Sequence, residues 1–137
     1  MPIYPPKVGV AVFVMKKGRF IMGHRQGSHG ADSWGLPGGH LEFGESWEAC
    51  VSRETLEEVG LTIKNIRFLT ATNDVFKSEN KHYITIFMIA DWAGGQAKVL
   101  EPDKCLSIGW FTYDTMPTNI FLPLINLKLN NPTLDLL

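Results

Sequence analysis

The chain has 137 residues, which suits a single domain over residues 1–137, and its 45% hydrophobic and 20% charged residues are enough for an ordinary core. Its formal net charge of −1 excludes a basic field that could recruit DNA or RNA as a polymer, so an anionic substrate has to be held by local groups or metal ions. No apolar run approaches the roughly 18 residues of a membrane span and residues 1–7 lack a signal-peptide pattern, so we expect a cytoplasmic protein with two reduced thiols, Cys50 and Cys105.

The first predicted elements form a β-hairpin. Val8–Met15 is a Val-rich run typical of a buried strand, and the turn signal Lys16-Lys17-Gly18 ends it. Arg19–Gly23 then returns as the second arm of the hairpin. A loop rich in Gly, Ser and His follows over Gln26–Ser33, and a turn-rich segment covers residues 34–44.

The second half of the chain favours strands and one more helix. Thr62–Asp74 and His82–Trp92 are predicted as two long strands, and Ser107–Tyr113 as a short one. Thr118–Leu129 is predicted as a helix that Pro123 interrupts. Since strands dominate and helices are few, the pattern indicates an α+β fold or a mixed sandwich with helices packed on sheets.

The central helix is predicted over Ser46–Val59, with Ser46 as its N-cap and Gly60 as the left-handed residue after its end. At about 100° per residue, Trp47, Cys50 and Val51 fall on one face, which should point at the core. The second half of that same face is acidic, since Glu54 and Glu58 lie on it and Glu57 lies at its edge.

An acidic run on a helix is usually a solvated surface, but here two observations argue against that interpretation. The glutamates follow the apolar stripe, and like charges at i+3 and i+4 near a helix C-terminus are locally unfavourable. Arg53 can pair with Glu57, but one arginine cannot neutralise three carboxylates. A hard divalent cation would resolve the conflict, because carboxylates suit Mg²⁺, and bound Mg²⁺ can polarise a phosphoryl group and orient an attacking water.

These residues also fit a known pattern. The pattern consists of Gly39, five residues, Glu45, seven residues and then Arg53-Glu54-Thr55-Leu56-Glu57-Glu58-Val59-Gly60-Leu61. This resembles the Nudix box, and every fixed position of the box matches. The one departure is Thr55, where an aliphatic residue is usual.

The resemblance implies a fold and a set of roles. The Nudix fold is a mixed β-sheet sandwiched between α-helices. By resemblance, Glu54, Glu57 and Glu58 would bind Mg²⁺ or Mn²⁺ together with the backbone carbonyl of Gly38. Glu54 would be the general base, although family members differ in this. Arg53 and Glu45 would form an ion pair that orients the helix and its loop.

The similarity extends to the Nudix branch that hydrolyses nucleoside triphosphates, including oxidised or methylated ones. It rests on Leu36-Pro37-Gly38-Gly39-His40-Leu41-Glu42-Phe43-Gly44-Glu45, Gly23-His24-Arg25, Glu101-Pro102-Asp103-Lys104-Cys105 and Phe121-Leu122-Pro123-Leu124. The implied substrate-binding residues are Arg25, Gly35, Leu36, Gly39, His40, Thr85, Phe121, Leu122 and Leu124. Arg25 and His40 would lie near the phosphates or sugar, whereas the apolar members would line a base pocket or, equally well, form plain core. Of the four histidines, only His40 has a specific reason to lie near the site.

Two departures leave the substrate open. Gly35 stands where a polar Gln or Ser is common in this branch, and Leu122 where a Trp is common. Our first hypothesis is Mg²⁺-dependent hydrolysis of a nucleoside triphosphate to the monophosphate and pyrophosphate. The alternatives are hydrolysis of another diphosphate, such as a nucleotide sugar or an isoprenyl diphosphate, and a non-catalytic nucleotide sensor. A homodimer is suggested by resemblance alone.

Overall fold

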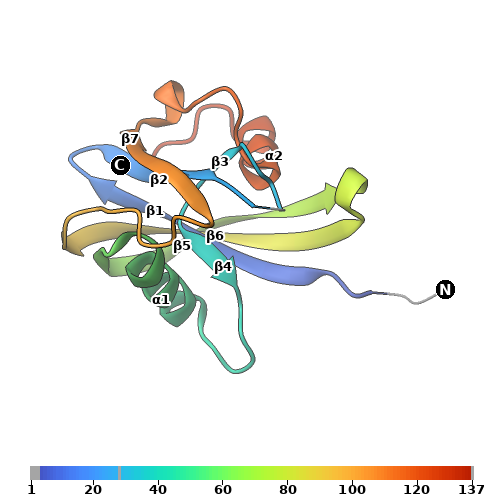
Figure 1. The fold of residues 1–137 in the computed structure, drawn as a ribbon, viewed down its shortest axis with the longest axis horizontal. Helices are drawn as coiled ribbons and strands as arrows, with labels where there is room; N and C mark the ends of the chain where they lie inside the picture. Colours follow the sequence, from blue (N-terminus) through green and yellow to red (C-terminus); the bar gives the residue numbers. More distant parts are fainter. Residues whose placement is uncertain (1–3, 28, 137) are drawn as a thin grey trace.

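The computed structural model describes residues 4–27 and 29–136, which form one seven-stranded mixed β-sheet with a helix on each face (Figure 1). The strands are β1 (Lys7–Lys16), β2 (Arg19–Arg25), β3 (Trp34–Gly35), β4 (Gly38–His40), β5 (Thr62–Phe76), β6 (Lys81–Gly94) and β7 (Cys105–Phe111). The helices are α1 (Trp47–Val59) and α2 (Leu122–Asn130), with short 3₁₀ turns η1 (Lys77–Glu79) and η2 (Tyr113–Thr115). None of the described helices is long and apolar enough to cross a bilayer.

The sheet divides along β1. The main strand order is β3-β2-β1-β6-β5, in which β1 and β6 run parallel and the other neighbours antiparallel. The first half of β1 also pairs with β4, from Gly9 opposite His40 to Ala11 opposite Gly38, whereas its last residues pair with β2. Because β4 and β2 pair with different parts of β1, the sheet opens between them. Gly38, Gly39 and His40, which the sequence predicted as site residues, lie in β4 beside this opening.

Each face of the sheet has its own core. On one face, α1 packs through Cys50, Val51 and Val59 on a cluster that includes Val12 and Met88. On the opposite face, α2 packs through Leu124 and Leu127 on a cluster that includes Phe13, Phe20 and Phe87. Figure 1 shows α1 below the sheet and α2 above it. The predicted α+β fold, a mixed sheet between helices, is therefore confirmed.

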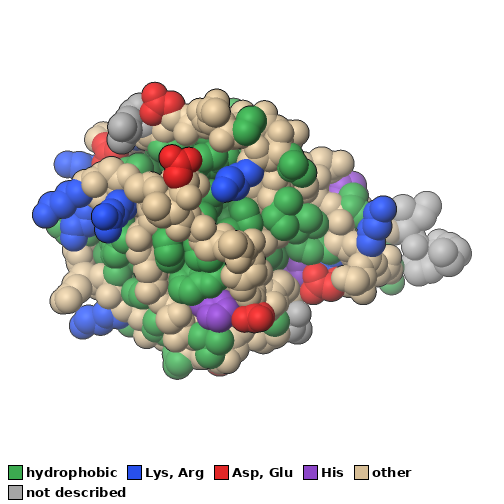
Figure 2. Space-filling model, turned by 90° about the horizontal axis from the view of Figure 1, so that it is seen from above, with side chains coloured by type: hydrophobic (Ala, Val, Ile, Leu, Met, Phe, Trp, Pro, Cys, Tyr) green, Lys and Arg blue, Asp and Glu red, His purple; other side chains and the backbone are tan. Residues whose placement is uncertain are grey.

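Charged side chains are unevenly spread over the α2 side. Figure 2 shows this side from above, with hydrophobic side chains over its centre. Lys and Arg side chains gather at its left end, where the turn between β1 and β2 lies in Figure 1. Lys16, Lys17 and Arg19 belong to this turn. The positive charge at that end is thus separated from the opening beside β4.

Most predicted elements are present, and the central helix has both predicted caps. The Ser46 side chain accepts a hydrogen bond from the Ala49 N–H, and Gly60 is left-handed at φ 74°. The hairpin turn also forms as predicted, since Lys17 and Gly18 both have positive φ. The two-residue β3 and three-residue β4 were not predicted, because their residues carry turn signals and lack strand periodicity.

Two predictions on helices were wrong. Pro123 does not interrupt the second helix, which begins at Leu122 and places the proline in its first turn, where a missing N–H costs nothing. Trp47 does not face the core, because it remains 39% exposed and packs against Phe68 at the surface. The buried residues of this helix therefore begin at Cys50.

Candidate active site

The second half of α1 carries two carboxylates on its buried side. Cys50, Val51, Thr55 and Val59 are the buried residues of the helix. Glu54 and Glu58 lie one turn apart beside them, and the Glu54 side chain is only 18% exposed. Glu57 is 54% exposed at the edge of the pair, and its Oε2 lies 3.8 Å from Nη1 of Arg53. The predicted placement of the three glutamates on the helix is thus observed.

Glu58 is the most buried of these carboxylates. Its Oε1 accepts a hydrogen bond of 2.9 Å from the N–H of Gly38 in β4. The pKa of Glu58 is raised to about 8, chiefly by burial and also by the nearby carboxylates of Glu54 and Glu101, which together outweigh the Gly38 hydrogen bond and the charge of Arg25. The Gly38 hydrogen bond and the charge of Arg25 do not fully stabilise the negative charge of a carboxylate in this position.

Glu54 lies directly over the backbone of Gly39. A Cβ on Gly39 would come within 2.5 Å of the Glu54 Cδ and 2.6 Å of its Oε1, so only glycine leaves room for the carboxylate. Burial raises the pKa of Glu54 as well, although Arg53 Nη1 donates to its Oε1 at 2.7 Å. The strand β4 therefore supplies a backbone cradle for both carboxylates.

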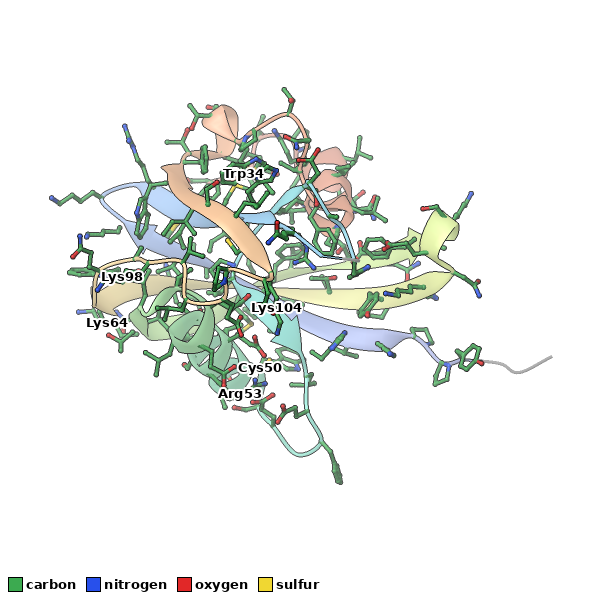
Figure 3. All side chains as sticks on the ribbon, viewed as in Figure 1. Trp34, Cys50, Arg53, Lys64, Lys98 and Lys104 are labelled. Atoms are coloured by element: carbon green, nitrogen blue, oxygen red, sulfur yellow. The ribbon has the colours of Figure 1, made fainter. Side chains whose placement is uncertain are left out.

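Arg53 ties α1 to the loop before it. Its Nε and Nη2 donate to the two carboxylate oxygens of Glu45 at 2.9 and 3.0 Å, which is the predicted ion pair. These bonds, with one from the Glu42 N–H, hold the pKa of Glu45 down at about 2. Figure 3 shows Arg53 on the part of α1 turned toward this loop. A bidentate clamp of this kind fixes the helix relative to β4.

The donor chemistry of this site fits a hard divalent cation. Two buried carboxylates with raised pKa values meet at a glycine cradle, and a third lies at their edge. Within residues 4–27 and 29–136, however, no three Asp, Glu, His or Cys side chains converge closely enough to enclose a metal ion by themselves. An ion held here would therefore share its ligands with water and substrate, as Mg²⁺ usually does. The Gly38 hydrogen bond in the structure uses its N–H, so a ligand role for its carbonyl remains a prediction.

Two hollows meet at β4. The acidic pocket, of about 470 Å³, is lined by Glu54, Glu58 and Glu101 on one side and by Arg25, Lys104 and Cys105 on the other. The apolar cavity, of about 170 Å³, lies on the α2 side and is lined mainly by Leu36, Phe76, Tyr83, Phe87, Phe121 and Leu124. Arg25, His29, Leu36, Gly38, Gly39 and His40 line both. A molecule at β4 can therefore reach the carboxylates with one end and the apolar cavity with the other.

Aromatic rings and one arginine form the mouth of the apolar cavity. The guanidinium of Arg25 lies 4.1 Å from the ring centroid of Phe121. The His29 ring lies 4.6 to 5.4 Å from the rings of Phe76, Tyr83 and Phe121, and its Nδ1 contacts Glu79 at 3.1 Å. On the other side, His40 stacks on Tyr83 and shares a hydrogen bond of 2.9 Å with its hydroxyl. Flat rings placed this way suit a flat ligand group.

The structure brings most of the predicted substrate residues to these two hollows. Arg25, Leu36, Gly39, His40, Thr85, Phe121 and Leu124 line the apolar cavity, and Gly35 lines the acidic pocket instead. Leu122 is not among the described residues that line either hollow, so its role in substrate binding stays a prediction. Helical geometry explains why it lines neither, because Leu122 is rotated by about 200° from Leu124, which faces the cavity.

Several site residues were missed in the sequence. His29 had no specific reason in the sequence to lie near the site, yet it lies among three aromatic rings. Its loop lacks any periodicity, so nothing in the sequence could have placed it. Tyr83 was within reach of prediction, since strand alternation puts it on the same face as Thr85 and Phe87. Glu101 was quoted only as part of a motif, and no pattern linked it to α1.

Comparisons with known proteins agree with this geometry. The model of the NUDIX domain matches residues 4–128. The NAD-capped RNA hydrolases NudC of Pectobacterium atrosepticum and Chromobacterium violaceum are 30% and 31% identical over 115 and 116 residues, which cover 83% and 84% of this chain. The chain spans about 42% of the length of these curated relatives.

Solved structures show the same fold. The MutT NUDIX hydrolase from Burkholderia pseudomallei matches with a TM-score of 0.83 and 28% identity, covering 91% of this chain and 98% of that one. A UDP-X diphosphatase matches with a TM-score of 0.71 and 22% identity over 99% of this chain and 68% of that one, a likeness of fold alone. The sheet and the helices thus follow one architecture.

Proposed function

The chain belongs to the Nudix hydrolase family, and from that premise we propose that it hydrolyses a nucleoside triphosphate, including oxidised or methylated forms, to the nucleoside monophosphate and pyrophosphate. Membership makes the chain an enzyme that cleaves diphosphate bonds, so the hypothesis of a non-catalytic sensor is set aside. The prediction that residues 1–137 act as one domain is retained.

The observation that carries the proposal is the pairing of two hollows at β4. Glu54 and Glu58 line the acidic pocket, and the rings of Tyr83 and Phe121 line the apolar cavity. A nucleotide has the same division, with a charged phosphate chain at one end and a flat base at the other. Arg25 lines both hollows, so it is placed to contact the part of the nucleotide that joins the base to the phosphate chain.

In the proposed reaction, Glu54, Glu57 and Glu58 with the Gly38 carbonyl would hold Mg²⁺ or Mn²⁺, which when bound neutralises phosphate oxygens and makes the phosphorus more electrophilic. The Glu54 carboxylate takes a proton from the attacking water. The water oxygen forms a bond to phosphorus while the bridging P–O bond breaks, and pyrophosphate leaves with the electron pair of that bond. Arg53 and Glu45 act as positioning residues, because their ion pair holds α1 against the loop before it.

A second candidate function is hydrolysis of a diphosphate with a second large group, such as a dinucleotide or nucleotide sugar. A specific observation favours it: an open cleft of about 750 Å³ shares Phe76 and Tyr83 with the apolar cavity and carries Lys7, Lys77 and Lys81. This cleft could receive the second half of such a substrate. The names of the similar proteins, NAD-capped RNA hydrolase and UDP-X diphosphatase, are compatible with it.

A substrate panel separates the two functions. The protein is incubated with Mg²⁺ and canonical, oxidised or methylated nucleoside triphosphates, NAD, nucleotide sugars or isoprenyl diphosphates, and the products are identified by chromatography. The first function predicts inorganic pyrophosphate and a nucleoside monophosphate from a triphosphate. Turnover of NAD or a nucleotide sugar into two monophosphates, with triphosphates left intact, would replace it by the second.

A further inference from the structure

A buried carboxylate stands behind the apolar cavity. Asp74 of β5 is fully buried, and its partners are all neutral. Its Oδ2 accepts hydrogen bonds from the hydroxyls of Thr72 at 3.0 Å and Thr85 at 2.6 Å, and its Oδ1 accepts one from Asn126 Nδ2 at 2.9 Å. Thr72 and Thr85 face each other across β5 and β6, which places both hydroxyls beside the one carboxylate oxygen.

These bonds fix the polarity of Thr85. A hydroxyl has one hydrogen, and a carboxylate has none to give, so the Thr85 hydrogen is committed to Asp74. The remaining capacity of the Thr85 oxygen is that of an acceptor. Thr85 is also one of the residues that line the apolar cavity. Any hydrogen bond that its hydroxyl makes to a molecule in the cavity is therefore one that the molecule donates.

We propose that Asp74 holds Thr85 as a hydrogen-bond acceptor and that the apolar cavity thereby selects a flat ligand group whose inner edge carries an N–H donor. The proposal rests on the proposed function in one respect, that the flat group of the substrate enters this cavity. Asp74 is a positioning residue, and Thr85 determines specificity. A ligand that presents a lone pair to Thr85 leaves two acceptors facing each other in a mainly apolar cavity, which costs binding free energy.

Two bicyclic probes of the same shape test the polarity. Indole has a ring N–H and no good acceptor, whereas benzoxazole has a ring-nitrogen lone pair and no donor. Their dissociation constants are measured by NMR titration of the metal-free protein. We expect Thr85→Val to lower the preference for indole over benzoxazole by roughly threefold to tenfold, the value of one hydrogen bond.

Asp74→Asn makes the sharper test. Asn126 still donates toward position 74, so the new amide turns its oxygen to Asn126 and its nitrogen to the threonines. Thr85 then accepts from that nitrogen, and its own hydrogen becomes free for the cavity. We expect the preference to reverse in favour of benzoxazole.

The matched control is Thr72→Val. It removes the same kind of bond to Asp74, but Thr72 is not among the described residues that line the cavity, so the probe preference should stay at the wild-type value. Thermal unfolding of all variants confirms that they are folded at the titration temperature. An unchanged preference in Thr85→Val, or an equal loss in Thr72→Val, would overturn the proposal. Because the probes carry no phosphate, pyrophosphate release by the wild-type protein reports separately on the proposed function.

Discussion

The acidic pocket and the apolar cavity are built in opposite ways. The central contact of the acidic pocket joins Gly38 in β4 to Glu58 in α1, twenty residues later in the chain. The apolar cavity takes residues from β1, β2, β4, β5, β6 and the start of α2, from Gly9 to Leu124. The carboxylate side of the acidic pocket is thus made by a short loop and helix, although its opposite side comes from β2 and residues 101–105. The apolar cavity has no such local part and exists only once the sheet has folded.

In the proposed function, the acidic pocket carries out the hydrolysis, and the apolar cavity recognises the flat group of the substrate. Charged groups of the acidic pocket are held by direct hydrogen bonds, such as the clamp between Arg53 and Glu45. The apolar cavity is held by ring packing around Phe121 and Tyr83, which tolerates change in shape. We therefore expect substitutions in the acidic pocket to lower kcat at little cost in stability, and substitutions in the apolar cavity to raise KM.

The largest effect is expected for Glu58→Gln. The amide oxygen can still accept the Gly38 N–H, but the charge is lost from the most buried position of the acidic pocket. We expect kcat for diphosphate hydrolysis with Mg²⁺ to fall by roughly 10³-fold, with the thermal midpoint unchanged or higher because a buried ionisable group is removed. Glu48→Gln, an exposed position in the first turn of the same helix, serves as control and should keep full activity. Near wild-type turnover by Glu58→Gln would mean that the acidic pocket is not where the chemistry takes place.

Two neighbouring glycines sharpen the comparison. In Gly39→Ala, the three atoms nearest to the new Cβ all belong to the Glu54 carboxylate, at 2.5 to 2.8 Å, so we expect this flexible side chain to move and the fold to stay intact. In Gly38→Ala, the Cβ meets the backbone of Val10 and Ala11, which cannot move without breaking the pairing of β1 and β4.

We expect Gly39→Ala to lower kcat by roughly 10²-fold at nearly unchanged stability, since a displaced catalytic carboxylate costs about that much. Gly38→Ala should instead lower the thermal midpoint by several degrees, in line with a loss of about 2 kcal/mol for steric overpacking. Kinetics and thermal melts of both variants check this. A large loss of stability in Gly39→Ala would contradict the placement of Glu54 over that glycine.

Phe121→Ala probes the apolar cavity. It removes the ring under the Arg25 guanidinium and one wall beside His29. We expect KM for the preferred nucleotide to rise roughly tenfold, with kcat within about twofold, because stacking on one aromatic ring contributes on the order of 1–3 kcal/mol to holding a base. Leu129→Ala, at a 74% exposed position of α2, should leave both constants unchanged. A fall in kcat without a change in KM would show that Phe121 serves the chemistry instead.

The same contrast explains what could be predicted from the sequence. Ser46, Gly60 and the glutamates of α1 were found because caps, helical spacing and a contiguous motif are local properties. His29 and Glu101 were missed, because their loops have no period and their partners lie 50 and about 45 positions away along the chain. The network of Asp74 and Asn126 is likewise invisible before the strands are paired.

An error also occurred where a local rule competes with packing. The periodicity of α1 placed Trp47 on the core face, but its ring packs on the exposed Phe68 of β5, the last strand in the order of the sheet. Leu122 was carried over by motif position, and as the first residue of α2 it lies about 200° around the helix from Leu124, so its role in binding stays a prediction. Residue spacing alone gives neither the part of the sheet on which a helix packs nor the residue at which a helix begins.

Thr55→Val should give the smallest effect. It changes the packing of α1 and leaves the glutamates of the same helix in place. Thr55 is fully buried, and its hydroxyl has no hydrogen-bond partner among the residues that the structure describes. Valine has nearly the same shape and removes the orphan hydroxyl, so we expect the free energy of unfolding to rise by about 1 kcal/mol and the thermal midpoint by roughly 3–5 °C, with activity unchanged. Thr72→Val is the opposite case, since its hydroxyl is bonded to Asp74 and its loss should destabilise the fold. If Thr55→Val were destabilising as well, the hydroxyl would have a partner in solution, such as a buried water, and the core under α1 would be less dry than its packing indicates.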